Sequence, residues 1–158
     1  MRPGARLRDY HYVVDRDGRI FHDGTEIVDP LVLRFFLRAM TLTRDGRYLV
    51  LCQGEQNWFE PYDTPFVVLR LRPLVEADRL RALELVFAGE HREPLDPWTL
   101  ESGNGHLYCR IRPDALRARF GRVAMQQLAP FLGDDGTGAA LLLGDARYPI
   151  RDRTTVSC

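Results

Sequence analysis

Residues 51–68 have the sequence LCQGEQNWFEPYDTPFVV, and the fold prediction depends most on this stretch. It begins in one apolar strand and ends in another. Between the two strands it gathers polar and aromatic side chains, namely Cys52, Glu55, Asn57, Trp58 and Asp63. A group of this kind suits a reaction site, a ligand pocket or a hydrogen-bonded cluster that holds the fold. The segments on either side indicate which fold surrounds it.

The flanking segments predict β-hairpins. In residues 10–24, YHYVVDRDGRIFHDG, two strands flank the dipeptide Asp17–Gly18, which is a strong hairpin signal. A second Asp-Gly dipeptide, Asp45–Gly46, precedes a strand over residues 48–52. Towards the C-terminus, AALLLGDARYPI predicts a closing hairpin that turns at Gly144–Asp145. Strands that occur in hairpins favour antiparallel sheets over a parallel α/β sheet.

Two helices are predicted between the strands. Asp29 is a suitable N-cap and Pro30 suits the first helical position, so a helix is expected over residues 30–40. A second helix is expected within residues 121–133, GRVAMQQLAPFLG, with Pro130 ending its last turn. The predicted fold class is therefore α+β, with antiparallel hairpins, roll-like sheets and two packed helices. The predicted division is an α+β subdomain over residues 1–74 and a β-rich subdomain with one helix over residues 75–158, with one continuous domain as the alternative.

Composition narrows the function class. The 158 residues are 45% hydrophobic and 28% charged, as in ordinary folded proteins, and their net charge is zero. All 22 basic residues are arginine, which is typical of a GC-rich genome, and the acidic residues balance them. We therefore expect no nucleic-acid partner. No apolar run is long enough to cross a membrane, so we expect no membrane partner and a cytoplasmic location.

Catalysis and metal binding are the less favoured interpretations. The three cysteines, Cys52, Cys109 and Cys158, do not suggest a disulfide framework. His106 and Cys109 are three residues apart, which places them on opposite faces of a strand, so we predict no metal and no cofactor. An enzyme that uses Glu55 or Cys52 with a histidine as acid, base or nucleophile remains the alternative function.

The favoured function is a non-catalytic module that binds a small polar ligand or a protein partner. Asn57 offers a donor and an acceptor, Glu55 can fix its orientation, and Trp58 supplies a flat apolar wall. The full set of predicted binding residues is Cys52, Glu55, Asn57, Trp58, Asp63 and Arg70. A structural network of the same residues is the competing interpretation, and a homodimer is the expected form of self-association.

The stretch also resembles known families. Cys52, Glu55, Asn57, Trp58, Asp63, Pro65 and Val67 follow a motif similar to that of uncharacterised protein family 0598, also called domain of unknown function 4505. The segments YHYVVDRDGRIFHDG and LESGNGHLYCRI resemble further parts of that family. The hairpin DRDGRIFHDGTEI, the helix after it and EPYDTPFVV resemble domain of unknown function 1285 more loosely. The second resemblance implies a compact α+β fold of two small subdomains that self-associates, and neither resemblance implies an activity.

Overall fold

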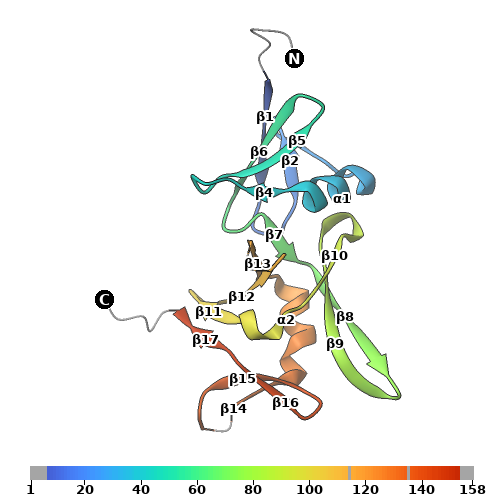
Figure 1. Cartoon of the computed structure of the whole chain (residues 1–158), viewed down its shortest axis with the longest axis vertical. Helices are drawn as coiled ribbons and strands as arrows, with labels where there is room; N and C mark the ends of the chain where they lie inside the picture. Colours follow the sequence, from blue (N-terminus) through green and yellow to red (C-terminus); the bar gives the residue numbers. More distant parts are fainter. Residues whose placement is uncertain (1–6, 114, 135, 154–158) are drawn as a thin grey trace.

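The protein is built in two parts that are stacked along its long axis (Figure 1). The computed structural model describes residues 7–113, 115–134 and 136–153, so Cys158 lies outside the described residues. We call residues 7–61 the N-terminal part and residues 66–153 the C-terminal part. The segment 62–65 joins them. The mixture of sheets and two α-helices confirms the predicted α+β class, and the roll-like curvature of the sheets stays a prediction.

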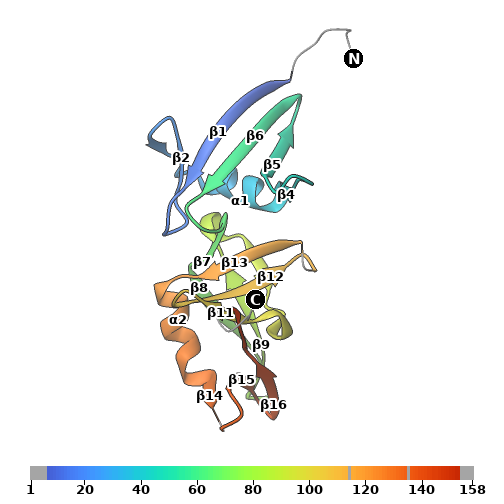
Figure 2. The ribbon, with the colours of Figure 1, turned by 90° about the vertical axis from the view of Figure 1, so that its left-hand side faces the viewer.

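The N-terminal part is one six-stranded sheet in the order β3-β2-β1-β6-β5-β4. Helix α1 lies against one face of this sheet, where Phe36 contacts the rings of Tyr12 and Phe59 at centroid distances of 5.1 Å. Figure 2 shows the opposite face of the sheet uncovered. The elements are β1 (Arg8–Val14), β2 (Ile20–His22), β3 (Thr25–Glu26), α1 (Pro30–Ala39), β4 (Thr41–Leu42), β5 (Tyr48–Cys52) and β6 (Glu55–Pro61).

The first hairpin and the first helix were correctly predicted. Val14 pairs with Ile20 across the first hairpin, and the side chain of Asp29 accepts a hydrogen bond from the backbone N–H of Leu31 at 2.9 Å. The helix presents Phe36 and Leu37 to the core, whereas Leu31 is 70% exposed.

The favoured antiparallel arrangement was wrong for the central pair of this sheet. Strands β1 and β6 pair in parallel over seven residues, from Arg8 opposite Glu55 to Val14 opposite Pro61. The chain leaves β1 through a hairpin, a helix and two short strands before it returns as β6. This connection is long enough to reverse the chain twice, which a parallel pair requires.

The C-terminal part contains three smaller sheets, in the orders β10-β9-β8, β17-β11-β12-β13-β7 and β14-β15-β16. Its elements are β7 (Phe66–Val68), β8 (Arg70–Glu76), β9 (Arg79–Val86), η1 (Ala88–Glu90), β10 (Arg92–Pro94), η2 (Pro97–Thr99), β11 (Glu101–Gly103), β12 (His106–Ile111), β13 (Leu116–Phe120), α2 (Arg122–Leu128), η3 (Ala129–Phe131), β14 (Leu132–Asp134), β15 (Ala139–Leu143), β16 (Ala146–Pro149) and β17 (Arg151–Asp152).

Prolines lie within β8 and just after α2 in the C-terminal part. Strand β8 continues through Pro73 and forms a hairpin with β9. Pro73 is tolerated because β8 is an edge strand, where a missing N–H removes no pairing. The last strand of the first sheet, β6, ends at Pro61, and β7 of the next sheet begins at Phe66. Strand β8 spans residues 74 and 75, and the division into subdomains at that point stays a prediction. Helix α2 ends at Leu128, just before Pro130, as predicted, and its Val123 is 51% exposed.

Candidate functional site

The hairpin between β5 and β6 places Cys52 opposite Glu55, on either side of a two-residue turn. Gln53 and Gly54 both have positive φ angles, of 48° and 80°. This combination is typical of a type I′ turn, in which glycine favours the second position. Cys52 is half-buried and is not part of a disulfide.

Asn57 is a buried part of the N-terminal core, with only 3% of its surface exposed. Its Nδ2 donates to the carbonyl of Val50 at 3.1 Å, and its Oδ1 accepts from the hydroxyl of Tyr12 at 3.2 Å. The donor group and the acceptor group of this amide are thus both hydrogen-bonded within the protein. This arrangement matches the structural network that the sequence left as an alternative.

Trp58 lies on the other face of the sheet from Asn57, because neighbouring residues of a strand point to opposite sides. Its Nε1 donates to Asp9 Oδ1 at 3.1 Å, and the guanidinium of Arg47 lies 3.8 Å from the centre of its ring. Glu55 and Asn57 share the face that α1 covers, whereas Trp58 is on the uncovered face. The three side chains do not converge on one pocket.

Asp63 lies in the segment that joins the two parts. Its Oδ2 accepts a hydrogen bond from the hydroxyl of Tyr108 at 2.5 Å and lies 3.9 Å from Nε of Arg119. Burial and this hydrogen bond raise the pKa of Tyr108, which keeps the phenol protonated. Strand β6 separates Glu55 from Asp63 by more than six residue steps, or about 20 Å at about 3.3 Å per residue. The two carboxylates therefore do not form an acid/base pair.

Arg70 is the remaining predicted binding residue, and it lies on β8. It forms an ion pair with Glu90, and the neighbouring outward arginine, Arg72, pairs with Glu84 at 3.5 Å. The arginine side chains are 42% and 49% exposed, so both pairs are surface contacts of small energetic weight.

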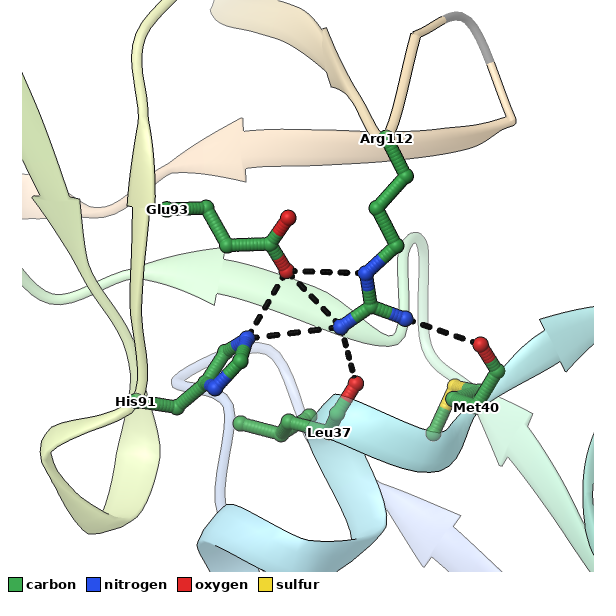
Figure 3. Close-up of polar contacts among 5 residues, drawn as sticks. All are labelled: Leu37, Met40, His91, Glu93 and Arg112. Carbon is green, nitrogen blue, oxygen red and sulfur yellow. Dashed lines mark hydrogen bonds and ion pairs between the residues drawn. The ribbon is translucent and has the colours of Figure 1, made fainter.

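The best-formed polar cluster was not predicted from the sequence. It consists of His91, Glu93 and Arg112, together with the carbonyl groups of Leu37 and Met40 at the end of α1 (Figure 3). Arg112 donates to Glu93 Oε2 from Nε at 3.0 Å and from Nη2 at 2.7 Å, and to the carbonyl of Met40 at 2.8 Å. Its Nη2 also bonds the carbonyl of Leu37. The cluster connects the C-terminal part to the last turn of a helix in the N-terminal part.

The electrostatics of this cluster favour an ionised Glu93. Burial raises the pKa of this carboxyl, but hydrogen bonds from His91 and Arg112 outweigh burial and hold the pKa below its usual value of 4.5. The Nε2 of His91 lies 2.8 Å from the carboxylate. The carbonyls at the C-terminal end of α1 also favour a cation, which Arg112 supplies.

The other end of α1 is held by the 3₁₀ turn η1. The carbonyl of Gly89 accepts from Nε of Arg34 at 2.9 Å. Gly89 has a φ of 69°, and a Cβ at this position would lie 2.7 Å from the carbonyl oxygen of Pro30. Helix α1 is thus contacted at both ends by the C-terminal part, and this indicates a structural role for the cluster around Arg112.

A pocket of about 390 Å³ lies where the two parts meet. We call it the junction pocket. Its lining comes from the β1–β2 turn, from β7 and the residue after it, and from the region where β13 enters α2. The lining includes Arg16, Asp17, Val67, Leu69, Arg119, Arg122 and Val123. None of the predicted binding residues lines this pocket, but Asp63 adjoins it through Arg119.

Cysteine and metal chemistry find little support in the described part of the chain. Burial raises the pKa of the Cys109 thiol far above its ordinary value, so it is unsuited to act as a nucleophile. Within residues 7–113, 115–134 and 136–153, no three His, Cys, Asp or Glu side chains are grouped as a metal would require. No α-helix in the same residues is long and apolar enough to span a membrane.

Comparison with known proteins adds information about the fold. No family model matches the chain, so the similarity to family 0598 stays a resemblance of motifs. A crystal structure of a DUF1285 family protein from Silicibacter pomeroyi DSS-3 is similar to this chain with a TM-score of 0.65 and 17% identity, over 93% of this chain and 82% of that one. A DUF1285 family protein from Shewanella baltica OS155 is similar with a TM-score of 0.57 and 13% identity, over 70% of this chain and 84% of that one. The chain therefore shares its fold with proteins of domain of unknown function 1285, as the looser resemblance implied.

Proposed function

We propose that this protein is a non-catalytic binding module and that a small molecule binds in the junction pocket. The observation that carries the proposal is the origin of the lining: Arg16 and Asp17 come from the N-terminal part, and Arg119, Arg122 and Val123 come from the C-terminal part. Ligand sites occur preferentially where two structural units meet, and the volume of about 390 Å³ is within the usual range of ligand pockets.

The alternative, an enzyme based on Glu55 or Cys52, has weaker support. No hydrogen bond joins either side chain to a histidine within the described ranges. Glu55 and Asp63 are also too far apart to share one substrate atom.

Of the residues predicted from the sequence, we assign a role in binding to Asp63 alone, as a positioning residue. Its carboxylate lies beside Arg119 and accepts from Tyr108, so it helps to hold the pocket arginine in place. We infer structural or surface roles for Cys52, Glu55, Asn57 and Arg70, and we assign Trp58 to a contact surface between two copies of the chain, which is the second candidate below.

A thermal-shift screen with a pocket-blocking variant tests the proposal. Val123 is 51% exposed at the pocket, so Val123→Trp should fill the pocket and leave the core intact. Val75→Trp is the matched control, since Val75 is 61% exposed on the β8–β9 hairpin. A ligand at about 100 times its Kd raises stability by about 2.7 kcal/mol. We expect a ligand that raises Tm in the wild type and in Val75→Trp but not in Val123→Trp. If every ligand that raises Tm does so in both variants, the binding site lies elsewhere.

The second candidate is self-association through the uncovered face of the N-terminal sheet. This face carries exposed Val13 and Leu51, at 52% and 62%, with Trp58 between them. Arg47 and Glu60 lie at the same groove, so the face offers both signs of charge. A surface with mixed charges and apolar residues can complement itself about a two-fold axis, and a second copy of this chain is the occupant that we propose.

Sedimentation velocity tests this second candidate. A dimer that Leu51→Glu converts to a monomer, while Val75→Glu leaves it intact, would support the sheet face as the interface. A monomer at all concentrations, or a dimer that both variants retain, would contradict it.

A further inference from the structure

We propose that the ligand of the junction pocket is a small organic anion with an apolar body, whose charged head is bound by Arg16, Arg119 and Arg122. This inference rests on the binding function proposed above and specifies the chemistry of that site. It is based on the positions and partners of the three arginines and on the apolar residues around them.

Arg119 is the central observation, because it is a buried cation with an incomplete set of partners. Only 6% of its surface is exposed, and its Nε has no hydrogen-bond partner among the residues that the structure describes. Nη2 bonds the carbonyl of Arg16, and Asp63 Oδ2 is 3.9 Å from Nε, which is too long for a hydrogen bond. The same carboxylate oxygen already accepts from Tyr108. A buried guanidinium normally has its charge and its donors satisfied. Asp63 is its one carboxylate partner among the described residues, and Arg119 lines the pocket, so an anion bound there would add a second negative partner.

The other two arginines of the pocket also have uncommitted donors. The guanidinium of Arg122 makes no hydrogen bond or ion pair with any residue that the structure describes. The Cζ atom of Arg16 lies 5.3 Å from the centre of the Tyr62 ring. Asp17 is the one carboxylate in the described lining, and it is 3.7 Å from Arg19. Three arginines against one aspartate leave the pocket positive, although the whole chain is neutral. Arginine binds carboxylate and phosphate groups in a bidentate manner, which suits the head of such a ligand.

The remaining wall is apolar and defines the second half of the ligand. Val67, Leu69, Phe120, Val123 and Met125 line the pocket. Leu69 and Val123 are 39% and 51% exposed, which makes them available to an apolar group. An inorganic ion would leave this wall in water, whereas a ligand with an alkyl or aryl body would cover it.

Calorimetric titration with a series of carboxylates tests the inference on the full chain. Butanoate, hexanoate and octanoate share the head and differ in the apolar body, octanamide is the neutral analogue, and inorganic phosphate is a head without a body. We expect Kd to fall by up to about fourfold for each methylene that the pocket covers, since a buried methylene contributes about 0.8 kcal/mol. Octanamide and phosphate should bind at least about tenfold more weakly than octanoate.

Arg122→Gln is the decisive variant, because Arg122 is exposed and has no partner among the described residues, so its loss should not impair folding. It should weaken octanoate about tenfold or more and reduce the salt dependence of binding. Arg44→Gln, an exposed arginine on the β4–β5 turn, is the control and should leave Kd unchanged.

Each outcome bears on a different part of the proposal. If octanamide binds as tightly as octanoate and Val123→Trp abolishes the binding of both, the anion assignment is wrong but the binding function stands. Phosphate as tight as octanoate would overturn the apolar half. If no carboxylate binds, the inference fails. The binding function is then decided separately by the thermal-shift screen with Val123→Trp, extended to neutral compounds.

Discussion

Replacing Arg112 with alanine is the most informative test of how the two parts are held together. The side chain is 24% exposed and joins Glu93 to two carbonyl groups at the end of α1. It also lies 5.0 Å from the ring centre of Phe66. The substitution removes all of these contacts at once and leaves Glu93, whose side chain is only 10% exposed, without its arginine.

The expected loss of stability follows from this burial. Removing one partner of a buried ion pair costs about 3–5 kcal/mol, and the partial exposure of Arg112 places the expected loss at the lower end, about 3 kcal/mol. For a protein of this size, 1 kcal/mol corresponds to about 2–4 °C in Tm, so Arg112→Ala should lower Tm by about 6–12 °C. The Tm of Arg112→Lys should lie between those of Arg112→Ala and the wild type, because lysine keeps the positive charge but lacks the planar guanidinium with its several donors.

Urea unfolding followed by circular dichroism measures the difference, with Arg72→Ala as the matched control. Arg72 is 49% exposed and pairs with Glu84 at 3.5 Å, so its loss should cost less than about 1 kcal/mol. If Arg112→Ala costs no more than Arg72→Ala, the cluster does not hold the two parts together and the reasoning from its burial is refuted.

Three further outcomes are expected. Gly89→Ala should lower the free energy of unfolding in urea by more than about 2 kcal/mol, because the new Cβ would lie 2.7 Å from a backbone oxygen of α1. Gly46→Ala is the control and should cost about 1 kcal/mol, since Gly46 also has a positive φ but a Cβ there would meet nothing within 4 Å. Asn57→Ala should cost about 2–3 kcal/mol by the same assay, since it removes a buried amide with two hydrogen bonds; a loss below about 0.5 kcal/mol would contradict its structural role. Because the pKa of Glu93 in the folded protein lies below 4.5, its ionisation stabilises the fold at neutral pH, and this stabilisation is lost as the pH falls below about 4.5. Glu93→Gln should therefore show a shallower loss of stability between about pH 5 and pH 3, and curves of equal slope would contradict this origin.

Local patterns were the part of the structure that the sequence predicted well. The Asp-Gly dipeptides, the N-cap at Asp29 and the stop at Pro130 each depend on a few neighbouring residues, and each is found in the structure. The parallel pairing of β1 with β6 was not predicted, because it depends on contacts between residues more than forty positions apart.

The candidate site was predicted poorly for the same reason. Glu55, Asn57 and Trp58 are close in sequence, but the alternation of a strand separates Trp58 from the other two. The residues that do come together, such as His91 with Arg112 or Arg16 with Arg119, are far apart along the chain. One local signal was available for Arg119: in β13, Arg117 and Arg119 alternate with Leu116 and Ala118, which predicts a strand with arginines on one face. The burial of Arg119 was not predicted by this pattern.

The shape of the junction pocket depends on the contacts around α1. The pocket takes its walls from both parts, so its shape depends on how the parts are placed, and contacts at both ends of α1 fix that placement. Neither Gly89 nor Arg112 lines the pocket. A variant at either position that still folds should therefore weaken ligand binding without the loss of any ligand contact. This effect would separate positioning from binding: Arg122→Gln should weaken binding at unchanged stability, whereas Arg112→Lys should weaken both together.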